Sequence, residues 1–507
     1  MKIPIALTAL AAAGFAQVSP STMPRVGSVD ERFQSFNIEM VEVTGGRFWR
    51  PYSEIGKILD KPTAGGPVGL DPNLYMERPP INLANLRLRK LAAALGPAYL
   101  RVSGTWANST YFGEAPKPPE GFGGVLTLAQ WKGVVDFSRA VDAKIVTSVA
   151  TGAGVRDSSG LWTPAQAQAF FDYTRSIGGG IAAAEFMNEP SFASMGGAPA
   201  GYDAAAYGRD LAVFNAFMKT SAPETKILGP GSVGEGVMLG PPELASRMIK
   251  SDDLLAKGGA DFDAFSYHFY GAVSKRCGIM GAAGQTTPDA ALTPEWLTRT
   301  DRVEAFYAAL RDKFAPGKPM WLSETGDAAC GGNPWGATFL DSFRYLHQLG
   351  SLAKRGVIVV THNTLAASDY GLIDEKTLAP RPNYWSALVW RRLMGPTVLD
   401  AGAQPSENLY LYAHCLRGKP GGVALLAINA DRAATATLHV ALKAERYTLT
   451  ARNLEDSRVQ LNSKDLQLAG DDIPALKGAP EEAGALKLAP ASITFLAIPS
   501  ANNPSCK

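Results

Sequence analysis

The feature that most constrains the fold is a repeated alternation between short apolar runs and longer segments of helical periodicity. This alternation extends from about residue 33 to residue 390 and contains eight such pairs. Because parallel strands need a crossover connection, which is usually a helix, the pattern predicts βα units. Eight units in succession predict a closed (β/α)8 TIM barrel rather than an open sheet. The predicted strands are residues 34–43, 98–104, 144–150, 182–188, 226–232, 264–270, 319–325 and 357–363.

The pattern changes after residue 392. Short alternating or wholly apolar runs now follow one another with turn residues between them, which is typical of an antiparallel β-sandwich. A chain of 507 residues also exceeds the usual size of one compact core. We therefore predict a barrel over residues 33–392 and a β-sandwich over residues 393–507. Residues 17–32 are an N-terminal segment that could join the sandwich.

The first 16 residues, MKIPIALTALAAAGFA, are predicted to be a secretory signal peptide. One lysine precedes an apolar stretch, and small residues stand where a signal peptidase prefers them. The alternative interpretation is a buried N-terminal helix. From the predicted signal peptide we expect a secreted or periplasmic protein. No later stretch reaches the roughly 20 apolar residues of a membrane span.

Charge and cysteine content narrow the classes of ligand. The net charge is only +2, and no basic run is interleaved with aromatic residues, so nucleic-acid binding is not predicted. A small neutral or singly charged ligand is favoured over an extended acidic polymer. The even cysteine count permits two disulfides, and none of the spacings is that of a zinc cluster. No metal is predicted, and the cysteines are Cys277, Cys330, Cys415 and Cys506.

Two carboxylates follow strands whose carboxyl ends should face the mouth of the barrel. Glu189, in an Asn-Glu-Pro triplet, ends the fourth predicted strand, and Glu324, in WLSETGD, ends the seventh. Active sites of TIM barrels lie at this end, and paired carboxylates are what a retaining glycosidase requires. Apolar neighbours favour a raised pKa and an acid role for Glu189, whereas Glu324 would be the ionised nucleophile. Taken alone, either triplet could equally be a satisfied loop carboxylate.

Three longer segments carry a resemblance to a known family. Residues 33–49 (FQSFNIEMVEVTGGRFW), 88–112 and 368–399 resemble the glycoside hydrolase family that contains heparanases and exo-acting β-glucuronidases, and within it the bacterial β-glucuronidases. The likeness covers most of the mature chain. It implies a retaining (β/α)8 glycosidase with a β-sandwich, in which Glu189 is the acid/base and Glu324 the nucleophile.

The resemblance also implies a set of substrate-binding residues. Tyr370 matches a tyrosine that receives the glucuronate carboxylate together with backbone N–H groups, which the glycine-rich stretch around Gly331 could supply. Ala329 stands where some bacterial relatives have a second tyrosine. A buried structural hydrogen bond is the alternative role for several members of the set. The other members are Glu39 and Thr105 near sugar hydroxyls, Asn188 on the 2-hydroxyl, and His268 and Tyr270 beside the nucleophile.

The predicted loops and the resemblance also suggest disulfides. Cys277 and Cys330 lie in the loops after predicted strands six and seven, so a bond between them would brace neighbouring walls of the site. Cys415 and Cys506 resemble the family's sandwich disulfide.

These observations together predict a cofactor-independent enzyme that releases β-linked glucuronic acid from the non-reducing end of glycans or glucuronides. The alternatives are an endo-acting heparanase-like hydrolase, a glycosidase for another β-linked sugar, and a carbohydrate-binding protein without catalytic activity.

Overall fold

The computed structural model describes residues 16–60, 71–237, 247–280 and 284–507. The predicted signal peptide lies outside these residues except for its last position. Eight parallel strands close into a barrel, which confirms the predicted fold class. In barrel order they are β3 (Gln34–Glu39), β6 (Ala98–Ser103), β9 (Ala143–Ser148), β10 (Ile181–Glu185), β11 (Lys226–Ser232), β12 (Ala264–Val273), β13 (Met320–Ala329) and β14 (Val357–His362).

Several strand ends differ from the prediction, and three of these differences change the position of a site residue relative to its strand. β3 ends at Glu39 because helix α1 (Met40–Thr44) follows at once, and its Glu42 carboxylate accepts a hydrogen bond from the Glu39 N–H at 2.7 Å. β10 ends at Glu185, so Glu189 lies on the loop beyond the strand rather than at its end. β13 continues to Ala329 in register with β12, so Glu324 lies inside its strand.

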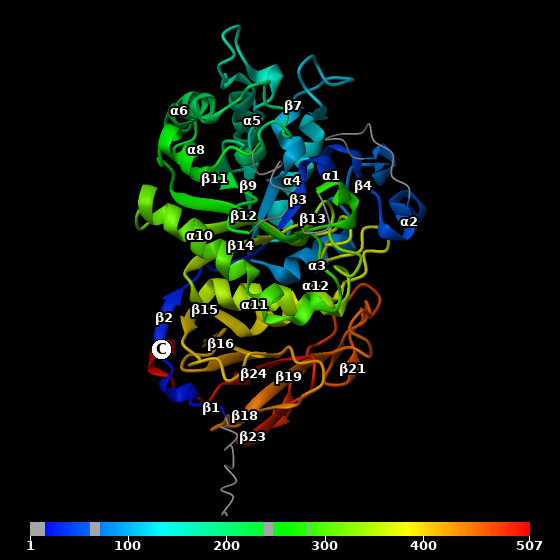
Figure 1. Ribbon diagram of the computed structural model, residues 1–507, viewed down its shortest axis with the longest axis vertical. Helices are drawn as coiled ribbons and strands as arrows, with labels where there is room; N and C mark the ends of the chain where they lie inside the picture. The colour runs from blue at the N-terminus through cyan, green and yellow to red at the C-terminus, as the bar shows by residue number, and fades with distance from the viewer. Residues whose placement is uncertain (1–15, 61–70, 238–246, 281–283) are drawn as a thin grey trace, which may run out of the picture.

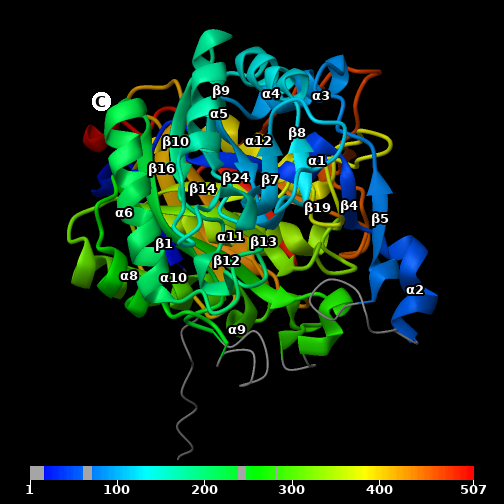
Figure 2. The same ribbon diagram turned by 90° about the horizontal axis from the view of Figure 1, so that it is seen from above.

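Helices cover the outside of the barrel (Figure 2). A typical one begins at the cap residue Asn85, whose side chain accepts from the Leu88 N–H, and buries Leu88, Leu91 and Leu95 against the sheet. The covering helices are α3 (Leu86–Leu95), α4 (Leu128–Ala140), α5 (Ala165–Ser176), α6 (Ala204–Ser221), α8 (Ser251–Gly258), α10 (Arg299–Phe314), α11 (Phe339–Lys354) and α12 (Pro382–Leu393).

Shorter elements lie in the loops of the barrel. β4 pairs with β5 antiparallel, and β7 pairs with β8 parallel. Their bounds, with the short helices, are β4 (Gly46–Trp49), β5 (Tyr75–Arg78), β7 (Thr110–Phe112), β8 (Gly124–Leu126), α2 (Tyr52–Asp60) and α9 (Pro294–Leu297).

The inside of the barrel is filled in layers. One layer takes a buried apolar residue from each of seven strands: Tyr99, Val146, Ala183, Leu228, Ala264, Trp321 and Val359. Because alternate residues of a strand point to the same face, the residues two positions later also point inward, one layer nearer the carboxyl ends. On three of these strands those residues are Arg101, Glu185 and Ser323, and all three are buried. The polar layer of the site therefore rests on an apolar one.

The C-terminal region forms two further sheets, which pack over a separate apolar core. Two N-terminal strands take part: β1 (Ala16–Val18) pairs with β18, and β2 (Arg25–Ser28) pairs with β15. The remaining strands are β15 (Met394–Leu399), β16 (Leu409–Leu416), β17 (Val423–Asn429), β18 (Ala436–Val440), β19 (Ala444–Thr450), β20 (Gln460–Leu461), β21 (Lys464–Asp465), β22 (Ala479–Glu481), β23 (Gly484–Leu488) and β24 (Ser492–Ile498).

Figure 1 shows helices α11 and α12 between the barrel and these sheets. Across this boundary the Tyr412 hydroxyl hydrogen-bonds with His347 Nδ1 at 3.0 Å. A disulfide between Cys415 and Cys506 fastens the C-terminus to β16. None of the described helices is long and apolar enough to cross a membrane.

Candidate active site

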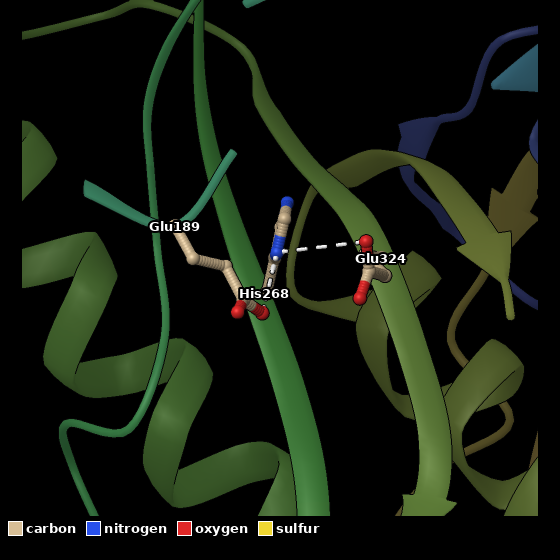
Figure 3. Close-up of side chains that lie close together, drawn as sticks. All are labelled: Glu189, His268 and Glu324. Carbon is tan, nitrogen blue, oxygen red and sulfur yellow. Dashed lines mark hydrogen bonds and ion pairs between the residues drawn. The ribbon is translucent and has the colours of Figure 1, made fainter. Parts of the chain in front are cut away.

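Glu189 and Glu324 face each other across the barrel mouth, with His268 of β12 between them (Figure 3). One ligand atom of each of these three residues lies within 4.8 Å of the other two. His268 Nδ1 is 3.1 Å from Glu189 Oε1 and 3.9 Å from Glu324 Oε2. The side chain of Glu189 is 18% exposed, that of Glu324 is 6% exposed, and that of His268 is fully buried. Of the two carboxylates, Glu189 is therefore the more accessible to solvent.

The backbone at Glu189 adopts a left-handed conformation, with φ at +53°. Such a conformation costs a non-glycine residue about 1–3 kcal/mol and needs support from its surroundings. Asn108 supplies it: its side-chain oxygen accepts from the Asn188 N–H at 3.0 Å, and its side-chain nitrogen donates to the Asn188 carbonyl at 2.9 Å. These two bonds replace strand pairing for the segment after β10, which explains why the strand ends early.

Arg101 of β6, which was not predicted as a site residue, links several polar side chains of the site to one another. Its Nη1 donates to Glu324 Oε2 at 2.6 Å, and its Nη2 donates to Glu185 Oε2 and to Asn188 Oδ1, both at 2.8 Å. Ser323 donates to the other Glu185 oxygen at 2.7 Å. Burial raises the pKa of Glu185, but Arg101 and His268 outweigh it and hold the pKa far below its usual value. Glu185 is therefore ionised and anchors Arg101.

Glu324 is held in its ionised form. Burial acts to raise its pKa, but the opposing influence of His268 and Arg101 is stronger and brings the pKa below its usual value. The Tyr270 hydroxyl also donates to Glu324 Oε1 at 2.6 Å, which favours the charged carboxylate. A buried, ionised carboxylate with both oxygens oriented is the form that a nucleophile requires.

Glu189 has the opposite tendency. Burial is the main cause of its raised pKa, the hydrogen bond from His268 opposes it, and the negative charge of Glu324 adds to it. Two neighbouring carboxylates with pKa values pushed apart mark an acid and an ionised partner.

His268 receives competing influences. Burial lowers its pKa and Glu324 raises it; Arg101 then lowers it, and hydrogen bonds with Glu185 and Glu189 bring it to about 9. In the charged form, which this pKa favours at neutral pH, the ring and the Arg101 guanidinium oppose each other across the 3.2 Å between Nε2 and Nη2, whereas in the neutral form Nε2 would accept a hydrogen bond from Arg101. In both forms of the ring Nδ1–H donates to Glu189, so its orientation does not depend on the charge.

A second polar group lies beside the nucleophile and centres on Asn363, at the end of β14. Its side-chain nitrogen lies 2.9 Å from Glu39 Oε1, 2.9 Å from the Tyr270 hydroxyl and 3.3 Å from the Tyr370 hydroxyl. Burial, followed by the charge of Glu324, raises the pKa of Glu39 well above its usual value. Asn363 thus brings three of the predicted substrate-binding residues together.

One carboxylate oxygen of Glu39 is available to a ligand: Oε2 is buried and has no hydrogen-bond partner among the described residues. The carboxylate lies directly against Gly104, where a Cβ would come within 1.6 Å of Oε2. Only glycine fits there. Thr105 follows Gly104 at the start of a short 3-10 helix, and no described residue hydrogen-bonds to its hydroxyl, so the structure gives it no direct link to the cluster.

Gly331 lies on the loop after β13, next to the loop that carries Tyr370. Its carbonyl accepts from Ser368 Oγ at 2.9 Å. Its φ of +85° and the 2.7 Å between a hypothetical Cβ and Ser368 Oγ both require glycine. The Gly332 N–H donates to the Ala328 carbonyl, so it is engaged within the loop. Ala329 packs against Tyr270 and Tyr370.

A disulfide between Cys277 and Cys330 joins the loops after β12 and β13, as the sequence analysis expected. It lies immediately before Gly331 in the chain, so it fixes this wall of the site.

Four residues of the site were not predicted from the sequence: Arg101, Glu185, Asn108 and Asn363. A usable signal exists for the first two, because AYLRVS and IAAAE each place one charged residue in an otherwise apolar barrel strand. Asn108 and Asn363 lie in loop and strand-end positions where the local sequence has no special pattern.

The donor types and spacing of Glu189, His268 and Glu324 could also hold a metal ion. Both Glu324 oxygens, however, already accept hydrogen bonds from Arg101 and Tyr270. A cation would have to displace these donors and lie close to the fixed charge of Arg101. The donor set therefore fits a pair of reacting carboxylates better than a metal centre.

Comparison with known proteins agrees with this geometry. Residues 106–350 match the family described as glycosyl hydrolase family 79, N-terminal domain. Over these residues the chain is similar to this family. It is 27% identical to heparanase-like protein 1 of Arabidopsis thaliana over 429 residues, which covers 76% of each chain. Mouse heparanase is 26% identical over 503 residues, covering 84% of this chain and 88% of the relative.

A shorter match reaches higher identity. The baicalin-β-D-glucuronidase of Scutellaria baicalensis is 34% identical over 189 residues, which covers 35% of this chain and 36% of the relative. Among solved structures, a 4-O-α-L-rhamnosyl-β-D-glucuronidase from Fusarium oxysporum superposes with a TM-score of 0.61 at 12% identity, covering 95% of this chain and all of that chain. This structural likeness concerns the fold alone. The match to this family and the similarity to these relatives support the assignment of the protein as a glycoside hydrolase.

Proposed function

We propose that the protein is a retaining exo-β-glucuronidase. The observation that carries the proposal is the pair formed by Glu189 and Glu324, which have an oxygen each within 4.8 Å of the other and pKa values displaced in opposite directions. Retaining enzymes hold their two carboxyl groups about 5–5.5 Å apart, whereas inverting enzymes leave about 6.5–9.5 Å for a water. The short separation favours a covalent intermediate.

In the first step, Glu324 attacks the anomeric carbon while the glycosidic bond breaks and Glu189 gives its proton to the departing oxygen. This forms a glycosyl ester on Glu324. Arg101 and Tyr270 hold the attacking carboxylate, and each contacts a different one of its oxygens. His268 holds the acid through its Nδ1.

In the second step, Glu189 removes a proton from water, and the hydroxide attacks the same carbon to release the sugar and Glu324. Configuration at the anomeric carbon is retained after two inversions. Asn188 is placed to assist both steps, because Arg101 fixes its side-chain oxygen and leaves its amide nitrogen free to donate. We assign that nitrogen to the 2-hydroxyl, whose contact strengthens as positive charge develops on the sugar ring.

Uronate recognition is assigned to Tyr370 and the N–H of Gly331, with Glu39 bonding sugar hydroxyls. Burial keeps the pKa of Tyr370 well above its usual value, so its hydroxyl remains a donor. Neutral donors can bind a carboxylate in a dry pocket. The names of several relatives support a glucuronide substrate, among them the baicalin-β-D-glucuronidase and a hyaluronoglucuronidase of Hirudo nipponia.

We further propose a secreted or periplasmic location. Two disulfides in the described chain are typical of an oxidising compartment. The partner is then a glycan or a glucuronide met outside the cytoplasm.

A substrate panel tests the proposal. We expect release of the chromophore from an aryl β-D-glucuronide, with much slower release from the aryl β-D-xyloside and β-D-glucoside. Rapid shortening of heparan sulfate or hyaluronan in the middle of the chain would instead support an endo-acting enzyme. Preference for a neutral glycoside would overturn the uronate assignment. Binding of oligosaccharides without any hydrolysis would favour a carbohydrate-binding protein.

A further inference from the structure

We infer that Arg276 is the positioning residue of the uronate subsite, because it joins the loop that carries Gly331 to the loop that carries Tyr370. This inference rests on the proposed function. The side chain of Arg276 is fully buried, so it acts through the two loops and does not touch the substrate.

The first set of contacts reaches the loop after β13. Nη1 of Arg276 lies 3.2 Å from the carbonyl oxygen of Cys330, 3.0 Å from that of Gly331 and 3.2 Å from that of Gly332. Three consecutive carbonyls thus turn toward one cation. Because C=O and N–H point in opposite directions across a planar trans peptide, the N–H of Gly331 is turned to the side away from Arg276. Arg276 therefore fixes the direction of the donor assigned to the carboxylate.

The second set reaches the neighbouring loop. Nη2 of Arg276 forms an ion pair with Asp369, the residue before Tyr370. The Asp369 N–H donates to the Gly331 carbonyl at 3.2 Å, which ties the two loops directly. A Cβ on Gly332 would lie 3.0 Å from the Tyr370 nitrogen, so the loops are in contact. One guanidinium group therefore sets the distance between the two carboxylate donors.

Further contacts fix Arg276 itself. Its Nε and Nη2 donate to the Arg50 carbonyl at 3.2 and 2.8 Å, and its guanidinium carbon lies 3.9 Å from the centre of the Tyr52 ring. The Cys277–Cys330 disulfide links the residues next to Arg276 and Gly331. Only a planar fork of several donors can satisfy carbonyls and a carboxylate at once.

The test replaces Arg276 and separates binding from chemistry. We expect Arg276→Met to raise KM for an aryl β-D-glucuronide about 10²-fold, because misplacing a binding group by about 1 Å has effects of that size. We expect kcat to change less than about fivefold, because the two glutamates keep their contacts. Arg276→Lys keeps the charge without the fork, and KM should rise about tenfold.

Arg156 offers a matched control on the loop after β9. It is also buried, pairs with an aspartate (Asp210, 2.8 Å), lies over a tyrosine ring (Tyr202, 5.1 Å) and donates to backbone carbonyls. Arg156→Met should lower thermal stability while leaving KM for the glucuronide within about twofold of wild type. Circular dichroism and thermal melting are recorded for every variant.

The outcomes separate the two proposals. A wild-type enzyme that cleaves the glucuronide, with KM raised in Arg276→Met but not in Arg156→Met, supports the inference. If kcat falls while KM stays unchanged, if Arg156→Met raises KM equally, or if Arg276→Lys binds like wild type, the inference is overturned and the proposed function stands. If Arg276→Met does not fold, the Lys variant alone decides by its KM. A wild-type enzyme inactive on the glucuronide overturns both.

Discussion

Two neighbouring layers of side chains inside the same barrel differ in polarity. The layer with Tyr99, Ala183 and Trp321 is apolar and buried, and its two largest rings lie 4.7 Å apart. Two residues further along the same strands, Arg101 and Glu185 form a buried ion pair that also holds the proposed nucleophile. Both layers are equally removed from water, yet only the first gains stability from its burial.

The contrast between the two layers explains how the barrel can hold a reactive site. Each buried charge loses several kcal/mol of hydration, and its partner restores this only in a closely fitted geometry. Apolar packing does not compensate for a misplaced charge. The charged side chains therefore depend on the tightly packed apolar layer beneath them to hold their strands in position. Four substitutions test whether the polar layer depends on the apolar layer in this way.

The largest effect is expected from Glu324→Ala, which removes the proposed nucleophile from the polar layer. We expect kcat on an aryl β-D-glucuronide to fall by roughly 10⁴-fold or more, in a variant that still folds because Arg101 keeps its ion pair with Glu185. Ser323→Ala, on the preceding residue, is the control and should stay within about tenfold of wild type. If Glu324→Ala keeps most of its activity, the assignment is wrong.

Arg101→Met should reduce both stability and activity. Breaking a buried ion pair costs about 3–5 kcal/mol because the remaining carboxylate is uncompensated. Arg101 holds the pKa of Glu185 below its unfolded value, so this stabilisation is present at neutral pH and is lost as the pH falls through the folded pKa. The stability difference between variant and wild type, measured by urea unfolding, should therefore shrink on acidification.

Trp321→Ala changes the apolar layer instead. We expect a loss of about 3–5 kcal/mol from the cavity, with no dependence on pH, since no titrating group is removed. Urea unfolding at two pH values distinguishes it from Arg101→Met. A loss that varied with pH as strongly as for Arg101→Met would show that the layers do not act separately.

His268→Asn should have the smallest of these effects on stability but should move the pH profile. Burial and Glu324 raise the pKa of Glu189, and the hydrogen bond from His268 lowers it. Without that bond the acid should keep its proton to higher pH. The alkaline limb of kcat/KM should therefore shift upward, and a downward shift would contradict the proposed contact.

Much of the fold could be predicted from the sequence, because the eight strands alternate regularly with helices. The exact ends of β3, β10 and β13 could not, since they depend on side chains distant in sequence, such as Asn108 holding the backbone of Asn188. The sandwich was predicted only as a class, from the change of pattern after residue 392.

The candidate site was predicted through its strand-end carboxylates and the family resemblance. What the sequence could not supply is the pairing that sets their charges. Arg101 contacts residues 84 to 223 positions away, and Asn363 contacts Glu39 at a separation of 324. Only the folded barrel brings residues so far apart in sequence into contact. The contacts of Arg276 could not be predicted for the same reason, because its neighbours in sequence indicate only a loop.

The most direct test of the account is covalent trapping. A 2-fluoro glucuronyl fluoride forms a glycosyl ester that hydrolyses slowly, so the intermediate of a retaining enzyme accumulates. We predict that intact mass rises by one fluoro-uronyl group and that peptide mapping places it on Glu324. Label on another residue, or release of the product with inverted anomeric configuration by proton NMR, would contradict the assignment of Glu324 as the nucleophile opposite Glu189.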